Sequence, residues 1–101
     1  MNSFDLRVYQ LVIQIPKGKV STYRDIAKAL GDERKSRRVG KALAKNPNPI
    51  IIPCHRVVKS DGSLGGYSLG VKIKEELLRK EGIVINKGKI DLSKYIFKSF
   101  K

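Results

Sequence analysis

Residues 21–45 read STYRDIAKALGDERKSRRVGKALAK, and this stretch decides the fold. The spacing predicts a short helix over 23–30, whose apolar side consists of Ile26, Ala27 and Leu30. Ser21 or Thr22 can cap its amino terminus, and Gly31 suits the left-handed residue that ends a helix.

A second helix is predicted over 36–45, after a polar turn at 32–35. Its apolar positions are Val39, Ala42 and Leu43, and small Gly40 and Ala44 permit close packing. A helix, a glycine-containing turn and a basic second helix form the pattern of a helix-turn-helix, although other pairs of short packed helices share it.

Elements on either side of this pair complete the predicted domain. An amphipathic helix is expected over 3–15, capped by Asn2 or Ser3, and another over 71–80, with apolar Val71, Ile73, Leu77 and Leu78, ended by Gly82. The apolar run 50–52 is expected to be buried, and the glycine-rich stretch 60–67 is a candidate hairpin. Residues 83–101 are expected to add a final strand or helix. The predicted fold class is mainly α with a short β-hairpin, a winged-helix-like helix-turn-helix domain.

Composition restricts the partners. The chain has 101 residues, the size of one domain, which we expect to span 1–101. It carries 22 Lys and Arg against 9 Asp and Glu, a net charge of +13, and this excess indicates a polyanionic partner. Nucleic acid is favoured over a membrane because no long basic segment carries aromatic anchors, although a small lysine-rich thermophilic or ribosome-associated protein has a similar composition. Without a signal peptide or membrane span, a soluble cytoplasmic protein is expected, associated with the nucleoid in a prokaryote.

Cys54 and His55 are the one cysteine and the one histidine of the chain, and they are adjacent. They can form neither an internal disulfide nor a four-ligand zinc site, so no metal and no cofactor is expected. A thiol becomes a strong nucleophile as thiolate, and an imidazole is a common base for it, acting directly or through a water. The alternative is a cysteine that serves as a small buried hydrophobic residue.

The segment Pro53-Cys54-His55-Arg56-Val57-Val58, with Asn46-Pro47 before it and Tyr67-Ser68 after it, resembles the O6-alkylguanine-DNA alkyltransferases. This resemblance extends from about Phe4 to Gly82. It implies direct repair of DNA, in which the protein flips O6-alkylguanine out of the duplex and transfers the alkyl group irreversibly to itself. Such a protein is a methylated-DNA–protein-cysteine methyltransferase that acts once.

The resemblance also implies roles for individual residues. Cys54 is the alkyl acceptor, His55 the base that acts through a water, and Glu81 the carboxylate that orients the histidine. Tyr23 contacts the extruded guanine and can protonate it, and Asn46 ties the second helix to the active-site turn. The remaining pocket residues are Leu43, Tyr67, Ser68 and the main chain of Cys54 and Val57.

For DNA, the resemblance implies that Arg37 enters the base stack, with adjacent Arg38 as the alternative. Further contacts are expected from Ser36, Lys41, Lys45 and Arg56. The expected partner is double-stranded DNA containing O6-alkylguanine, bound through its minor groove by a monomer. Two alternatives lack transfer activity: an alkyltransferase-like lesion-binding protein, in which another residue replaces the cysteine, and a small helix-turn-helix regulator.

The chain departs from the family in two respects. The amino-terminal domain of ribonuclease-like fold that larger members carry is expected to be absent. Leu69 stands where the family often has glycine, directly after the pocket serine. We expect this side chain to narrow the pocket or stiffen its loop, so that bulky adducts and free-base inhibitors react poorly.

Overall fold

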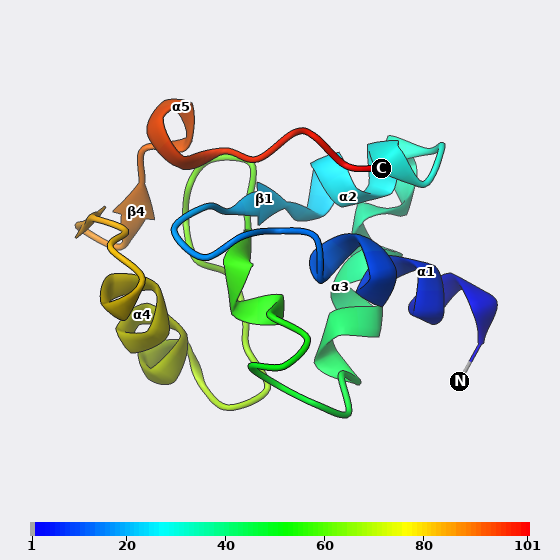
Figure 1. The fold of residues 1–101 in the computed structure, drawn as a ribbon, viewed down its shortest axis with the longest axis horizontal. Coiled ribbons are helices and arrows are strands. Elements are labelled where there is room, and N and C mark those ends of the chain that lie inside the picture. Colours follow the sequence, from blue (N-terminus) through cyan, green and yellow to red (C-terminus); the bar gives the residue numbers. More distant parts are fainter. Residues whose placement is uncertain (1) are drawn as a thin grey trace.

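The computed structural model describes residues 2–101, and the helix-turn-helix lies at one end of it (Figure 1). Helix α2 (Tyr23–Ala29) is capped by Thr22, whose hydroxyl accepts from the backbone amide of Asp25 at 3.0 Å. Gly31 has φ +103, and a 3₁₀ turn, η1 (Glu33–Lys35), leads into α3 (Ser36–Ala44). The two helices predicted from residues 21–45 are thus confirmed.

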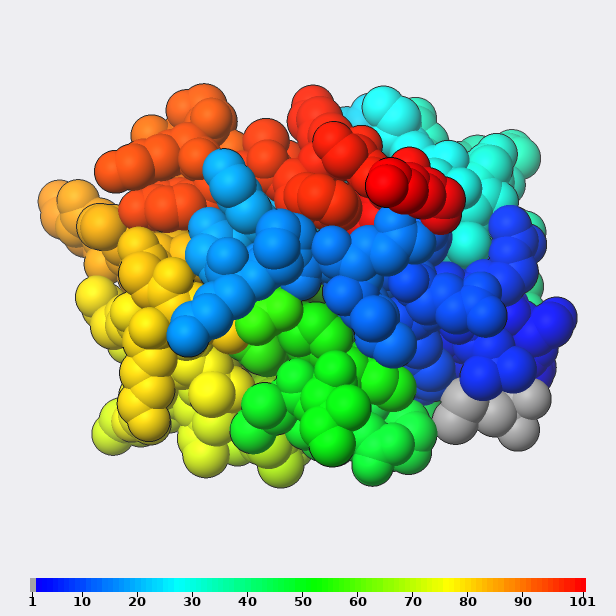
Figure 2. Space-filling model, viewed as in Figure 1, coloured from blue at the N-terminus to red at the C-terminus, as the bar shows by residue number. Residues whose placement is uncertain are grey.

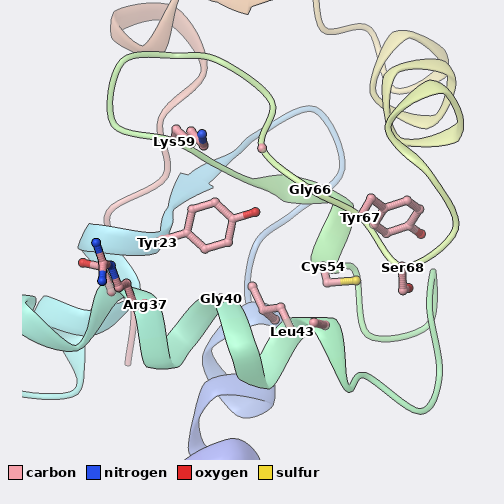
Figure 3. A pocket seen from close by; sticks show the side chains of 12 residues that line it. Tyr23, Arg37, Gly40, Leu43, Cys54, Lys59, Gly66, Tyr67 and Ser68 are labelled. Carbon is pink, nitrogen blue, oxygen red and sulfur yellow. The ribbon is translucent and has the colours of Figure 1, made fainter.

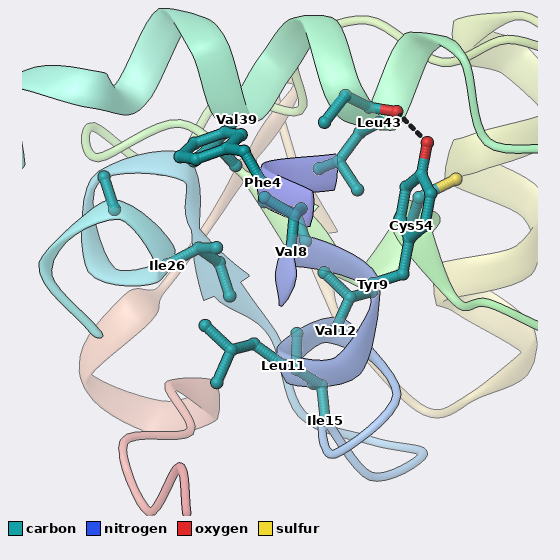
Figure 4. Close-up of a cluster of buried hydrophobic side chains, with 13 residues drawn as sticks. Phe4, Val8, Tyr9, Leu11, Val12, Ile15, Ile26, Val39, Leu43 and Cys54 are labelled. Carbon is teal, nitrogen blue, oxygen red and sulfur yellow. Dashed lines mark hydrogen bonds between the residues drawn. The ribbon is translucent and has the colours of Figure 1, made fainter. Parts of the chain in front are cut away.

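Helix α1 (Ser3–Val12) packs against α2 and α3. Asn2 caps it by accepting from the backbone amide of Asp5 at 2.8 Å. The helix is shorter than the predicted 3–15, because residues 13–15 leave it in a tighter turn before Pro16. The three helices enclose the first of two hydrophobic clusters, shown in Figure 4, to which Phe4, Val8, Ile26 and Val39 belong.

The second cluster includes Leu78 of helix α4 (Val71–Lys80), which lies at the opposite end of the molecule in Figure 1. The cluster also includes Val20, Leu64 and Ile83. Between the clusters, strand β1 (Ser21–Thr22) pairs in parallel with β2 (Val57–Val58), directly after the 3₁₀ turn η2 (Cys54–Arg56). Successive side chains of a strand point to opposite faces, so Val57 joins the first cluster and Val58 the second. Cys54 is therefore held where the two halves of the core meet.

The carboxy-terminal residues form a hairpin of β3 (Ile85–Asn86) and β4 (Lys89–Ile90), then the short helix α5 (Leu92–Tyr95). The last segment, orange to red in Figure 2, runs back along one edge of the visible face toward α1. The Phe97 amide donates to the Val20 carbonyl at 2.8 Å, and Phe97 and Phe100 pack on the first cluster. The tail therefore covers the core, as expected.

The fold class, mainly α with a short β-hairpin, is confirmed, but two local expectations are wrong. Residues 60–67 do not form the expected hairpin: they contain a turn and an isolated bridge between Ser63 and Lys89. The hairpin lies instead at 85–90. The run 50–52 is not buried: Ile50 is 53% exposed and Ile51 79%, because the chain turns there, with Ile50 at φ +79. Among residues 2–101, no helix is long and apolar enough to cross a bilayer.

Candidate active site

A cavity of about 500 Å³ lies between α3 and the loop that follows β2 (Figure 3). On the α3 side it is lined by Ser36, Arg37, Gly40, Leu43 and Ala44, and on the other side by Cys54, Lys59 and the loop residues 65–68. Tyr23 reaches in from the start of α2. Four pocket residues expected from the sequence, Tyr23, Leu43, Tyr67 and Ser68, are thus brought together with the cysteine.

Cys54 belongs to the hydrophobic core and is only 4% exposed, yet its sulfur points into this cavity between Leu43 and Ser68. Burial raises the pKa of the thiol, and two neighbours partly offset it: a hydrogen bond from Asn46 and the charge of Lys74. At neutral pH the thiol is therefore protonated, and its use as a nucleophile requires a base.

His55 and Glu81 meet on the inner side of the same turn. His55 Nε2 lies 2.9 Å from Glu81 Oε2, and the histidine is 1% exposed. Burial lowers the pKa of His55, so the ring is neutral at physiological pH. We infer from the contact with the carboxylate that Nε2 carries the proton. Nδ1, which has no hydrogen-bond partner within residues 2–101, is then the acceptor.

Arg56 was expected to contact DNA, and its surroundings contradict this. Its side chain is only 16% exposed, and its guanidinium faces the interior. Nε and Nη2 donate to the two oxygens of Glu81 at 2.9 and 2.7 Å, and Nη1 donates to the Ile15 carbonyl at 2.8 Å. These hydrogen bonds lower the pKa of Glu81, against the burial that alone would raise it.

Lys74 is a buried cation behind the pocket that sequence reasoning missed. It is 0% exposed, and its Nζ donates to the carbonyls of Val57 and Gly66 at 2.7 and 3.1 Å and lies 3.5 Å from the Tyr23 hydroxyl. Burial lowers the pKa of Lys74 to about 8. The carbonyl of Val57 is thus engaged by the lysine and Val57 does not line the cavity, so the expected contact of its main chain with guanine is not supported.

The two arginines of α3 have different surroundings. Arg37 lines the cavity, whereas the Arg38 guanidinium lies over the Phe4 ring, 4.1 Å from its centroid. Lys45 forms an ion pair with Asp5 at 2.8 Å but remains 60% exposed, and Lys41 is exposed. Of the two alternatives at the pocket, this geometry favours Arg37.

Leu69 does not narrow the cavity. Its side chain is 47% exposed and does not belong to the lining. Lys59, Gly65 and Gly66 do line it, although the sequence did not single them out as site residues. The glycine-rich loop shortly after Cys54 could have indicated part of this lining, because glycine is favoured where φ is positive or where another group approaches the backbone closely. Within residues 2–101, no group of His, Cys, Asp and Glu side chains could hold a metal ion.

The structure is similar to S. pombe Atl1 in complex with damaged DNA containing O6-carboxymethylguanine, with a TM-score of 0.85 and 36% identity over 97% of each chain. It is also similar to Mycobacterium tuberculosis OGT in complex with DNA, with a TM-score of 0.79 and 39% identity over 81% of this chain and 50% of that one. The fold is thus that of an alkyltransferase domain.

Residues 3–83 match the family described as 6-O-methylguanine DNA methyltransferase, DNA binding domain. The chain belongs to this family. It is 51% identical to a bifunctional methyltransferase/endonuclease of Picrophilus torridus, over 99% of this chain and 34% of that protein. It is 54% identical to a methylated-DNA–protein-cysteine methyltransferase of Metallosphaera sedula, over 83% of this chain and 52% of that protein. The chain thus matches only about a third to a half of the length of these relatives.

Proposed function

We propose that this protein repairs alkylated DNA directly. It binds double-stranded DNA as a monomer, receives an extruded O6-alkylguanine in the cavity and moves the alkyl group to Cys54. The observation that carries the proposal is the position of the Cys54 sulfur, which points into a cavity of about 500 Å³ while the His55–Glu81 pair stands beside it in the interior.

The reaction uses five side chains of the site. His55 takes the proton of the Cys54 thiol through an intervening water, and Glu81 orients the imidazole and stabilises its cationic form. The sulfur then attacks the alkyl carbon, so that a C–S bond forms and the bond from that carbon to guanine O6 breaks. The electron pair goes to the purine, which takes up one proton with Tyr23 as the donor. The Tyr23 phenolate and the His55 imidazolium then return to their neutral forms by proton exchange with solvent, so that the net change moves the thiol proton to the purine. Asn46 steadies the sulfur through its hydrogen bond.

The thioether product consumes the protein, because no second thiol is present in the sequence to release the alkyl group. One molecule of protein therefore removes one alkyl group.

Binding precedes this chemistry and depends on charge. The net charge of +13 and the basic residues of α3 attract the phosphates, so affinity falls with salt and depends little on sequence. The helix enters the minor groove, and Arg37, at the edge of the cavity, takes the place of the extruded base. Ser36, Arg38, Lys41 and Lys45 add contacts to the backbone.

A second candidate function is binding of the lesion without transfer. The similarity to S. pombe Atl1 over 97% of both chains favours it. The cysteine at position 54 favours transfer instead, because it supplies the alkyl acceptor that the reaction requires.

Mass spectrometry tests the two candidates directly. After incubation with a duplex containing one O6-methylguanine, the peptide with Cys54 is expected to gain one methyl group at a ratio of one per protein molecule. Cys54→Ser is the matched control, which binds the same duplex without an adduct. Binding by the wild type with no adduct on Cys54 would establish the second candidate, and preference for one undamaged sequence would indicate a regulator.

A further inference from the structure

We propose that Arg56 is a positioning residue, which holds the Glu81 carboxylate against His55 and keeps the imidazole neutral and ready to accept a proton. This inference rests on the proposed function for its role in transfer, but its electrostatic part can be tested without DNA.

Glu81 is the carboxy-terminal cap of α4, where the exposed carbonyls of the helix carry partial negative charge. A carboxylate is disfavoured at such a position, and Glu81 is also only 10% exposed. Arg56 contacts both of its oxygens and offsets these costs, so that the carboxylate is held in place beside His55.

The two parallel hydrogen bonds from Arg56, at 2.9 and 2.7 Å, fix the plane of the carboxylate as a single bond cannot. Glu81 Oε2 accepts from Arg56 Nη2 and lies 2.9 Å from His55 Nε2, so fixing this oxygen also fixes the imidazole. The third bond, from Nη1 to the Ile15 carbonyl, anchors the guanidinium to the chain just beyond α1.

Charges of both signs surround the His55 imidazole. Glu81 faces it with one negative charge, whereas Arg56 beside it and Lys74 on α4 contribute two positive charges. The Tyr67 ring stands edge-on at 6.4 Å, and Cys54 precedes it in η2. With Arg56 in place the carboxylate orients His55 without holding it permanently protonated, which would abolish its capacity as a base. Without Arg56, the negative charge of Glu81 would act on the imidazole alone.

His55 is the one histidine in the sequence, so the histidine ring signals in NMR spectra belong to it and can be followed directly. The wild type without DNA is compared with two variants. Arg56→Met removes the charge and keeps most of the aliphatic side chain, whereas Arg56→Lys keeps the charge but cannot form the two parallel hydrogen bonds of the guanidinium. Lys89→Met is the control for net charge, since Lys89 is 60% exposed and its Nζ lies 4.0 Å from Asp61 Oδ2. Ring ¹H and ¹⁵N shifts are followed with pH.

In Arg56→Met, His55 is expected to titrate at higher pH than in the wild type, with its proton no longer restricted to Nε2. Lys89→Met and Arg56→Lys are expected to titrate like the wild type. Single-turnover transfer to Cys54 should slow about tenfold in both Arg56 variants, as for other residues that orient a reacting group through a second side chain. Arg56→Lys keeps the comparison meaningful if Arg56→Met does not fold.

An unchanged titration in a folded Arg56→Met would overturn the electrostatic part, and wild-type transfer in Arg56→Lys would overturn the positioning part. A shifted titration in a protein whose wild type transfers nothing would instead contradict the proposed function and leave the electrostatic inference standing.

Discussion

The side-chain amide of Asn46 lies 3.1 Å from Cys54 Sγ and donates a hydrogen bond to it. The same nitrogen donates to the Ile52 carbonyl at 2.9 Å, and the amide oxygen accepts from the backbone of Asn48 at 2.9 Å. One buried side chain, two residues after the end of α3, thus connects that helix with the turn that carries the sulfur.

Asn46→Ala should therefore change both stability and thiol chemistry. Loss of these hydrogen bonds leaves the Ile52 carbonyl with the Cys54 amide as its remaining backbone donor, and we expect a loss of about 1–3 kcal/mol in the free energy of unfolding. Because the hydrogen bond lowers the pKa of Cys54, its loss should raise that pKa and slow alkylation by iodoacetamide at neutral pH. Asn48→Ala, which removes an exposed side chain, is the matched control. Equal alkylation rates in the two variants would contradict the role given to Asn46.

The pH dependence of transfer should follow His55. Burial lowers its pKa below the ordinary value of about 6.5, and the neutral ring is the form that accepts a proton. Single-turnover rates are expected to be constant from about pH 7 to 8 and to fall only at pH below about 6.5. A rate that rises steadily through pH 8 would show instead that direct ionisation of the thiol limits the reaction.

The burial of Lys74 predicts how the free energy of unfolding changes with pH. Its pKa is about 8 in the fold against 10.5 for the ordinary side chain, so between these values the unfolded chain binds more protons and stability rises with pH. The shift corresponds to at most about 3 kcal/mol for a fully buried group. Urea unfolding of the wild type and Lys74→Met at pH 8 and pH 10 isolates this contribution, since the other titrating groups are common to both. The variant should gain less stability over this interval, and an equal gain would show that Lys74 is not a perturbed cation.

These residues also show which parts of the structure can be predicted from the sequence and which cannot. The helices could be predicted because the signals for each lie in a few adjacent residues. These signals are the cap at Thr22, the apolar spacing in α3 and the glycine at position 31. On α4 the apolar residues Val71 and Ile73 are 50% and 42% exposed while Lys74 is buried, since the carbonyls that receive it lie on β2 and the loop at Gly66. Such partners are close only after folding. Arg56 was misjudged for the same reason, because its charge alone suggested DNA.

Arg37 and Arg38 are a matched pair of adjacent exposed arginines with different neighbours. Arg37→Ala should weaken binding to a duplex that contains O6-methylguanine more than binding to undamaged DNA, because Arg37 lines the cavity. Arg38→Ala should weaken both alike, as expected for a phosphate contact, and should cost about 0.5–1 kcal/mol of stability through the lost stacking on Phe4. Fluorescence anisotropy with both duplexes measures the difference, and an exchange of the two patterns would assign the extrusion role to Arg38.

Gly65 and Gly66 line the same wall of the cavity but differ in the room around them. A Cβ on Gly65 would lie 2.9 Å from the Tyr23 hydroxyl oxygen and 3.2 Å from its ring, and Gly65 has φ +74. Gly65→Ala therefore strains the backbone by about 1–3 kcal/mol and pushes the tyrosine from its place. A Cβ on Gly66 would meet nothing within 4 Å. We expect Gly65→Ala to lose most transfer activity and some stability, with Gly66→Ala close to the wild type in stability. If the two alanine variants lose transfer activity equally, the loop does not control the position of the Tyr23 ring. The glycines would then serve only to leave space for the guanine.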